Sequence, residues 1–134
     1  MATQIAWIGL GNMGRGMCTN LVEKGNLTKP VLIFNRTKKR AEDLSSKLPS
    51  GKSVVADSVE EAVAKSDIIF SCVGDDAALT GIIDKAVTEN LEGKLFVECS
   101  TVHPDTTAKV AETVHKKGAF FVASPGKHRQ KPSD

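Results

Sequence analysis

The most constraining feature of the sequence is a glycine-rich segment that lies between an apolar run and a helical pattern. The segment matches the spacing GxGxxG and reads Gly9-Leu10-Gly11-Asn12-Met13-Gly14. It directly follows the apolar run at 4–8 and opens a stretch of helical period at 13–24. Where a strand turns into a helix at such a motif, backbone amides at the helix N-terminus can face an anion. We therefore predict a phosphate-binding loop here; the alternative is a flexible turn that is merely rich in glycine.

The three glycines of this loop have separate expected roles. Gly9 permits a tight turn, Gly11 lets the backbone approach a pyrophosphate, and Gly14 lets the helix pack against the strand. We expect the whole loop to contribute to a dinucleotide-binding site, through Gly9, Leu10, Gly11, Asn12, Met13 and Gly14.

Short apolar runs alternate with longer segments of helical period along the rest of the chain. The predicted strands cover residues 4–8, 31–34, 53–56, 68–73, 95–99 and 119–123. The predicted helices cover residues 13–24, 38–48, 59–65, 77–89 and 105–117. This alternation is typical of βαβ units around a parallel sheet. Six strands joined by five helices predict an α/β fold, a doubly wound parallel sheet of the Rossmann dinucleotide-binding type with helices on both faces.

Local signals mark where several helices begin. Ser58 followed by Glu61 predicts a capping box, in which the carboxylate reaches back to the amide of the cap. We expect Asp75 and Asp76 to cap the next helix rather than to act as catalytic acids or metal ligands. His103, which precedes a proline, is expected in a solvated loop.

The end of the second predicted strand discriminates between cofactors. An NAD site usually has Asp or Glu there, which binds the ribose hydroxyls. This chain has Asn35-Arg36-Thr37 instead. The guanidinium of Arg36 can hold a 2′-phosphate in a forked pair, and the neighbours add neutral hydrogen-bonding groups. NADP(H) is therefore favoured over NAD(H), and three further cations strengthen the positive field or simply face solvent: Lys38, Lys39 and Arg40.

Two later strand ends are expected at the same crevice, because ligands of such sheets lie beyond the carboxyl ends of the strands. The first of these ends is Val73-Gly74, where the glycine lets the chain pass close to the cofactor. The second contains Thr101, whose hydroxyl is expected near the nicotinamide ribose.

Composition excludes several classes of protein. The 134 residues are 40% hydrophobic and 25% charged, which is typical of one ordinary soluble domain. The net charge of +2 is carried by residues 127–134, so the balanced body has no electrostatic footprint for nucleic acid. No run approaches the roughly 18 apolar residues of a membrane span, and the first residues do not resemble a signal peptide. We therefore expect an intracellular, cytoplasmic protein.

The cysteines and histidines offer no catalytic or metal-binding pattern. Cys18, Cys72 and Cys99 fit neither a disulfide framework nor a CxxC spacing. Each lies among apolar neighbours, so we expect buried, reduced thiols. No arrangement of Ser, His and Asp suggests a nucleophile, and no metal site is predicted.

Taken together, the motifs resemble the β-hydroxyacid dehydrogenases, whose cofactor domain is of the 6-phosphogluconate dehydrogenase type. The family includes 3-hydroxyisobutyrate dehydrogenase and NADPH-dependent glyoxylate and succinic semialdehyde reductases. The resemblance runs over 4–125 and rests on segments 8–14 with Met17 and 20–21, 35–37, 70–76 and 98–104. Trp7 and Cys18 depart from it, because the family tends to have an aliphatic and a small residue there.

The resemblance implies hydride transfer between NADP(H) and a small hydroxyacid or its aldehyde or keto partner. The family holds the substrate with a Val-Ser-Gly-Gly-like loop, and its acid/base lysine lies in a helical second domain. Here 123–125 begins that loop and Gly126-Lys127-His128-Arg129 replaces the rest. We therefore expect an NADP(H)-binding domain over 1–125, a disordered basic tail over 126–134, and no catalytic residue. Alone, this chain is expected to be inactive, because positioned proton transfer contributes about 10² to 10⁴ in rate.

Two alternatives belong to other functional classes. A non-catalytic NADP(H)-sensing or protein-interaction module would use the same loop, and exposed apolar faces would favour partner binding or self-association. An S-adenosylmethionine-dependent methyltransferase shares the glycine-rich loop. Such an enzyme usually has an acidic residue at the second strand end, where Arg36 lies.

Overall fold

The computed structural model describes residues 3–99 and 102–123, and this part of the chain contains six strands and five helices. The strands are β1 (Ile5–Ile8), β2 (Val31–Phe34), β3 (Ser53–Val55), β4 (Ile68–Ser71), β5 (Leu95–Glu98) and β6 (Phe120–Ala123). The helices are α1 (Asn12–Lys24), α2 (Lys38–Lys47), α3 (Val59–Lys65), α4 (Asp76–Ala86) and α5 (Pro104–Lys116). Every predicted element is present, and the ends differ from prediction by three residues at most.

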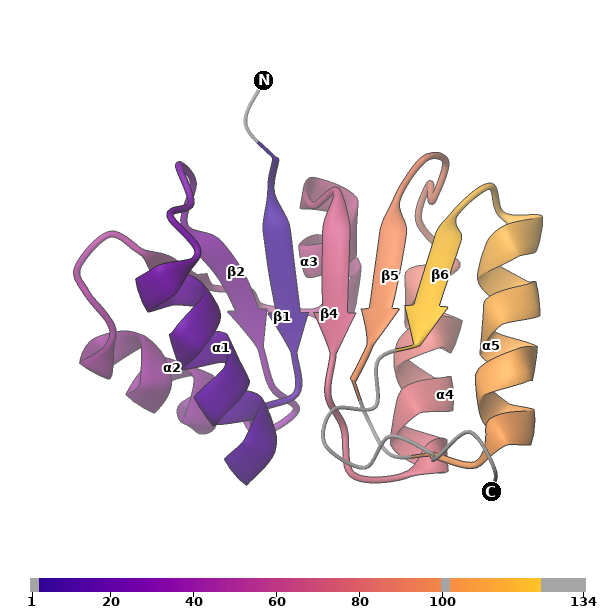
Figure 1. Ribbon diagram of the computed structural model, residues 1–134, viewed down its shortest axis with the longest axis horizontal. Coiled ribbons are helices and arrows are strands. Elements are labelled where there is room, and N and C mark those ends of the chain that lie inside the picture. The colour runs from indigo at the N-terminus through magenta and orange to yellow at the C-terminus, as the bar shows by residue number, and fades with distance from the viewer. Residues whose placement is uncertain (1–2, 100–101, 124–134) are drawn as a thin grey trace, which may run out of the picture.

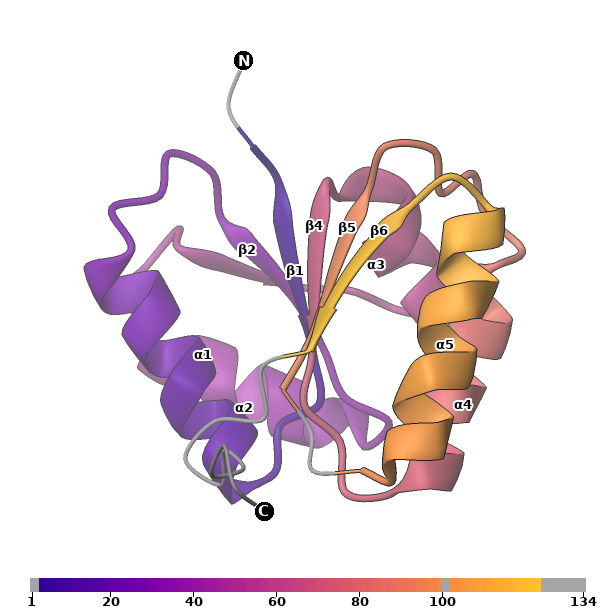
Figure 2. The ribbon, with the colours of Figure 1, turned by 45° about the vertical axis from the view of Figure 1, so that its right-hand side comes forward.

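All six strands are parallel and lie in the order β3-β2-β1-β4-β5-β6 (Figure 1). Helices α1 and α2 cover one face of the sheet, and α3, α4 and α5 cover the other (Figure 2). The predicted doubly wound Rossmann fold is confirmed. Its strand order reverses between β1 and β4, and ligands of open α/β sheets bind beyond the carboxyl ends of the strands at such a point.

Two apolar cores lie on opposite faces of the sheet, and β1 contributes to both. Ala6 and Ile8 pack against the α3–α4–α5 side, whereas Ile5 and Trp7 pack against the α1–α2 side. All four residues of β1 are therefore buried. This explains why the strand is a continuous apolar run rather than an alternating one.

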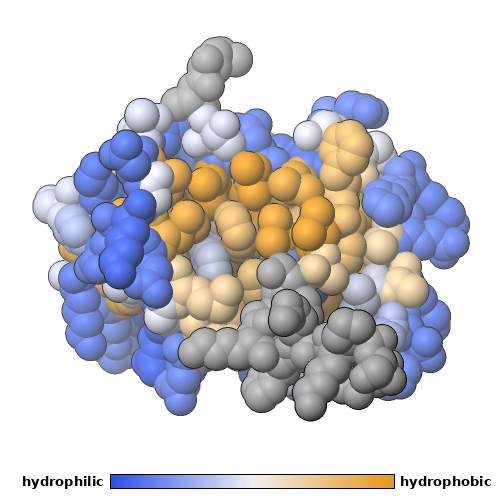
Figure 3. All heavy atoms as spheres, viewed as in Figure 1, coloured by the Kyte–Doolittle hydropathy of each residue, from blue (hydrophilic) through white to orange (hydrophobic). Residues whose placement is uncertain are grey.

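One half of the sheet lacks a helix on the α1–α2 side within the described residues. Six side chains in two register rows form this surface, which we call the open apolar face: Ile68, Leu95 and Phe120, then Phe70, Val97 and Val122. Phe120 is 63% exposed and Val122 is 49% exposed. Figure 3 shows the resulting apolar patch. A contiguous exposed patch of this kind is a candidate surface for contact with another group.

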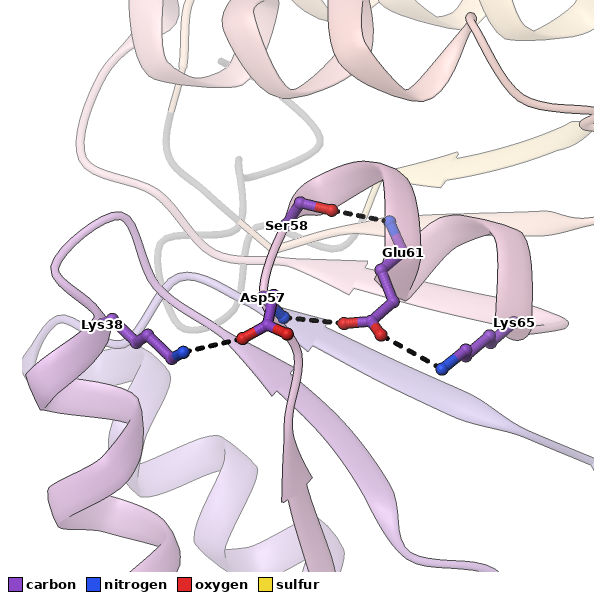
Figure 4. Close-up of polar contacts among 5 residues, drawn as sticks. All are labelled: Lys38, Asp57, Ser58, Glu61 and Lys65. Atoms are coloured by element: carbon purple, nitrogen blue, oxygen red, sulfur yellow. Dashed lines mark hydrogen bonds and ion pairs between the residues drawn. The ribbon is translucent and has the colours of Figure 1, made fainter.

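The start of α3 has a capping arrangement that differs in one bond from the predicted box. The Glu61 amide donates to Ser58 Oγ at 3.0 Å, as expected. The Glu61 carboxylate, however, accepts from the Asp57 amide at 2.7 Å and not from the amide of the cap (Figure 4). The carboxylate thus reaches one residue before the cap. Its other oxygen, Oε2, accepts from Lys65 Nζ at 3.1 Å.

Only one of the two aspartates at the start of α4 caps that helix. Asp75 Oδ1 accepts from the Ala78 amide at 2.7 Å, which confirms its predicted role. The prediction for Asp76 was wrong, because its carboxylate accepts from Thr106 Oγ1 at 2.6 Å and from the His103 amide at 3.3 Å. Asp76 therefore joins the start of α4 to the start of α5. His103 is exposed, as expected, and its Nδ1 also caps α5.

The three cysteines are free and buried, as predicted.

Among the described residues, no helix is both long and apolar enough to cross a bilayer.

The Asp76 contacts predict an acid-dependent stability. The pKa of Asp76 lies below its ordinary value, first because Thr106 donates to the carboxylate and also because the His103 amide does. A lowered folded-state pKa stabilises the fold above the ordinary carboxyl pKa, and that contribution is lost as pH falls through the lowered value. We expect Asp76→Ala to lower the melting temperature by a few degrees at neutral pH, with the difference from wild type closing below about pH 4.

Thermal unfolding followed by circular dichroism across this pH range measures the effect. Asp84→Ala is the matched control, since Asp84 is an exposed carboxylate on the same helix without a hydrogen bond or ion pair to the described residues. A difference for Asp76→Ala that stays constant with pH would show that the charge of the carboxylate is not involved.

Candidate functional site

The carboxyl ends of β1, β2 and β4 open into a groove of about 850 Å³. Its walls come from segments 8–14, 34–37 and 72–75, from Arg40 and Val59, and from one face of α4: Ala77, Ala78, Gly81, Ile82 and Lys85. The groove lies at the point where the strand order reverses, which is where the sequence predicted a ligand site.

Eleven predicted site residues line this groove: Gly9, Leu10, Gly11, Asn12, Met13, Gly14, Asn35, Arg36, Thr37, Val73 and Gly74. Thr101, the twelfth, lies outside the described residues. Segments that are distant in the sequence therefore meet around one space, and their binding of a cofactor stays a prediction at this point.

The three glycines of the loop differ in what surrounds them. Gly9 has a φ of +103°, and a Cβ there would lie 2.1 Å from the Cys72 carbonyl oxygen. A Cβ on Gly14 would lie 2.3 Å from the Gly9 carbonyl oxygen. A Cβ on Gly11 would meet no heavy atom within 4 Å. Gly9 and Gly14 are thus required by the fold itself, whereas the missing side chain of Gly11 leaves space on the groove side.

The N-terminus of α1 has the features of an anion-binding end. Gly11 is its N-cap, no side chain caps the first turn, and that turn contains no acidic residue. In the first turn, Asn12 Oδ1 accepts from Arg15 Nη2, and Met13 is 45% exposed. The first-turn amides of a 13-residue helix therefore remain available to a negative group, which the helix dipole also favours.

Asn35 is engaged by the protein backbone. Its Oδ1 accepts from the Leu10 amide at 2.8 Å, and its Nδ2 donates to the Thr37 carbonyl at 3.1 Å. The residue predicted as a polar group for the cofactor thus also ties the glycine-rich loop to the end of β2.

Of the four cations in segment 36–40, two form ion pairs with the described residues and two do not. Lys38 Nζ lies 2.7 Å from Asp57 Oδ1 (Figure 4), and Lys39 Nζ lies 3.6 Å from Asp43 Oδ1. The hydrogen bond with Asp57 raises the pKa of Lys38, and the same bond lowers the pKa of Asp57. Arg36 and Arg40 line the groove, and neither guanidinium has an ion pair within the described part of the chain. The two arginines are the cations that remain available to a phosphate.

Lys85 adds a third cation to the groove from the α4 wall, and it was not among the predicted site residues. A signal was present, because Ala78, Gly81, Ile82 and Lys85 recur at helical spacing. Three of them are small or aliphatic, so this helix face leaves room beside the groove.

The buried groups beneath the groove do not supply a nucleophile. Burial, and secondarily the Glu98 carboxylate, raises the pKa of Cys72. Burial also raises the pKa of Cys99 to about 11 and that of Cys18 to about 12. All three groups are therefore neutral thiols at pH 7. Ser71 Oγ donates to Glu98 Oε2 at 2.7 Å, so both buried polar side chains are engaged.

Comparison with known proteins agrees with this geometry. A family model described as the NAD binding domain of 6-phosphogluconate dehydrogenase matches residues 4–126. The chain belongs to this family. Membership accounts for the glycine-rich loop, the strand order and the groove together, and it favours a dinucleotide over the S-adenosylmethionine alternative.

Several curated relatives are oxidoreductases. The chain is 41% identical over 113 residues to an NADH-dependent oxidoreductase of Aspergillus ustus, covering 84% of this chain and 39% of the relative. It is 33% identical over 134 residues to glyoxylate/succinic semialdehyde reductase 1 of Arabidopsis thaliana, covering 98% of this chain and 44% of the relative. The chain thus spans about two fifths of the length of these proteins.

Solved structures show the same fold. A 3-hydroxyisobutyrate dehydrogenase of Mycobacterium tuberculosis is 26% identical with a TM-score of 0.81, covering 93% of this chain and 40% of that one. An imine reductase of Myxococcus stipitatus, solved with NADP⁺, is 26% identical with a TM-score of 0.76, covering 90% and 39%. The resemblance to β-hydroxyacid dehydrogenases is confirmed, and the chain is an NAD(P)-binding domain of such oxidoreductases.

The open space beside Gly11 predicts a variant that loses binding but keeps the fold. We expect Gly11→Val to abolish binding of NADPH and of NADH, because the new side chain would extend into the groove from a position where a Cβ meets no heavy atom within 4 Å. Calorimetric titration measures the binding, and circular dichroism checks that the variant is folded.

Gly16→Val is the matched control. Gly16 lies in the same helix, and a Cβ there also meets no heavy atom within 4 Å, but Gly16 does not line the groove. The control is expected to bind as wild type does. Full affinity in a folded Gly11→Val variant would mean that the loop is only a turn.

Proposed function

We propose that this chain is an NADP(H)-binding domain of a β-hydroxyacid dehydrogenase-like oxidoreductase. The complete enzyme would transfer hydride between NADP(H) and a small hydroxyacid or its aldehyde or keto partner. The observation that carries the cofactor preference is Arg36, which lies at the end of β2 and lines the groove without an ion pair to the described residues. A carboxylate at this place would repel a 2′-phosphate, whereas a guanidinium can bind it with two parallel hydrogen bonds.

Each wall of the groove would bind a different part of the cofactor. The amides at the N-terminus of α1 would hold the pyrophosphate, and the open side of Gly11 would admit it. Arg36 would hold the 2′-phosphate, with Arg40 and Lys85 adding positive charge to the same space. Apolar side chains on the α3 and α4 side would line the adenosine end: Val59, Ala78 and Ile82. Bound NADP(H) supplies the hydride chemistry.

The described residues of the groove include no histidine and no carboxylate free for proton transfer. The ionisable groups of the groove are three cations, the protonated Cys72 and Asp75, which is engaged as a helix cap. We therefore propose that this 134-residue chain binds the cofactor without turnover, and that substrate binding and proton transfer need residues outside it. Residues 1–125 are the proposed cofactor domain, and 126–134 the proposed basic tail.

The proposed setting is intracellular and cytoplasmic, with a dinucleotide rather than a nucleic acid or a membrane as the partner. Three buried free thiols support a reducing compartment. The balance of charge outside residues 127–134 supports the absence of a nucleic-acid surface.

Arg36 gives the sharpest test of cofactor preference. We expect Arg36→Ala to weaken NADPH binding about tenfold or more and to change NADH binding little, since only NADPH has the 2′-phosphate. Lys38→Ala is the matched control, because Lys38 is a neighbouring cation already paired with Asp57. Calorimetric titration of each variant with both cofactors measures the change. Equal losses for NADPH and NADH would contradict the assignment.

The open apolar face supports a second proposal, that two copies of this chain associate through it. Its most exposed side chains are Phe120 at 63% and Val122 at 49%, both on the edge strand β6. A patch of six side chains is small beside the ~1,200 Å² at the lower end of stable interfaces, so we expect a weak dimer whose population depends on concentration.

Sedimentation velocity at micromolar and millimolar concentrations tests this association. We expect Val122→Asp to remain monomeric at both, because a charge within an apolar contact is costly to desolvate. Val54→Asp is the matched control, since Val54 is 48% exposed against 49% for Val122 but lies on the opposite edge strand. A wild-type chain that is monomeric throughout would exclude self-association through this face.

A further inference from the structure

A single peptide unit at the start of the glycine-rich loop is held by side chains at both of its ends. Its carbonyl oxygen, on Gly9, accepts from Trp7 Nε1 at 3.0 Å. Its amide, on Leu10, donates to Asn35 Oδ1 at 2.8 Å. The two side chains come from different strands, β1 and the end of β2, so they fix the plane of this peptide from two directions.

The orientation of this peptide matters because it leads into the helix that would bind the pyrophosphate. Gly9, with its positive φ, lies on one side of the peptide, and Gly11, the N-cap of α1, follows one residue later. Glycine allows backbone rotation that other residues resist. A rotated Gly9–Leu10 peptide would lose both hydrogen bonds and would leave the buried Trp7 N–H without an acceptor, which is costly.

Trp7 is itself held firmly enough to act as such a donor. It is only 2% exposed, and its ring stacks on Phe70 with centroids 5.1 Å apart and planes 13° apart. The indole N–H is a donor without an acceptor function, so a carbonyl is the partner it requires. An aliphatic residue, which the related family tends to have at this position, cannot form this bond.

We propose that Trp7 is a positioning residue for dinucleotide binding, acting with Asn35 as a clamp on the Gly9–Leu10 peptide. Trp7 does not line the groove and acts only through the loop. The inference rests on the proposed binding of NADP(H) for its functional consequence. The clamp itself is a property of the ligand-free chain and can be tested there.

The decisive variant is Trp7→Phe, which keeps an aromatic ring against Phe70 and removes the donor. We expect the NADPH dissociation constant to rise about fivefold, the size of one lost neutral hydrogen bond. We also expect the amides of Leu10 and Gly11 to exchange with solvent several-fold faster in the ligand-free chain. Calorimetry measures the first quantity, and amide exchange followed by NMR measures the second.

The control separates positioning from general stability. Val22→Ala removes buried volume from the same apolar core, but Val22 lies in the third turn of α1, away from the loop. Urea unfolding measures how much free energy of unfolding each variant loses, so that their effects on binding can be compared at known stability. A merely structural role for Trp7 predicts equal effects of both variants on NADPH affinity and on loop exchange, and that outcome would overturn the proposal.

A second substitution covers the case in which Trp7→Phe does not fold. Replacing Trp7 by benzothienylalanine, which has sulfur in place of the indole N–H, keeps the size and shape of the ring and removes only the donor. Unchanged loop exchange in either folded variant would exclude the clamp. If wild type does not bind NADPH, the proposed function fails, while faster loop exchange without the donor would still support the clamp.

Discussion

The close approach of two chain reversals, at the carboxyl ends of β1 and β4, is the contact on which the rest of the site depends. Gly9 turns out of β1 so near to the Cys72 carbonyl that a side chain cannot fit, and Gly14 brings α1 against the Gly9 carbonyl. Only glycine at both positions lets α1 begin directly above the sheet. The helix N-terminus then points into the space where the strand order reverses, so the position of the groove follows from two missing side chains.

The charge of the groove depends on which cations are neutralised nearby. Lys38 and Lys39 both pair with carboxylates, one across a loop and one along its own helix. The arginines on either side of them face the groove instead. An arginine fork binds phosphate with more geometric specificity than an ammonium group does. Pairing of the lysines with Asp57 and Asp43 thus leaves the local positive potential on the groups best suited to phosphate.

The order of strands and helices could be predicted because each element has a local pattern that is complete within about ten residues. Apolar runs, a helical period and a cap such as Ser58 need no knowledge of distant residues. The eleven groove residues were found for the same reason, since they lie in motifs at strand ends that the parallel topology brings together.

What could not be predicted depends on contacts between residues far apart in the sequence. Asp76 is a residue type that often caps helices, but its carboxylate accepts a hydrogen bond from Thr106 because the start of α5 lies beside it. Asn35 was predicted as a polar group for the cofactor, but its bond with the Leu10 amide could not be predicted, because Leu10 lies 25 residues away in the sequence. Local patterns record which residue types are present, whereas the partner of a polar side chain depends on packing of the whole sheet.

The same dependence connects the open apolar face to the loop. One register row crosses the sheet from Trp7 through Phe70 and Val97 to Val122. Trp7 is 2% exposed, whereas Val122 is 49% exposed. Phe70 belongs to both regions, because it stacks on Trp7 and also forms part of the open face. The Trp7 ring, whose N–H donates to the Gly9 carbonyl, is therefore covered by a helix on one side and by the partly exposed Phe70 on the other. Any group that packs on Phe70 therefore adds apolar contact to the support of Trp7, whose N–H donates to the Gly9 carbonyl.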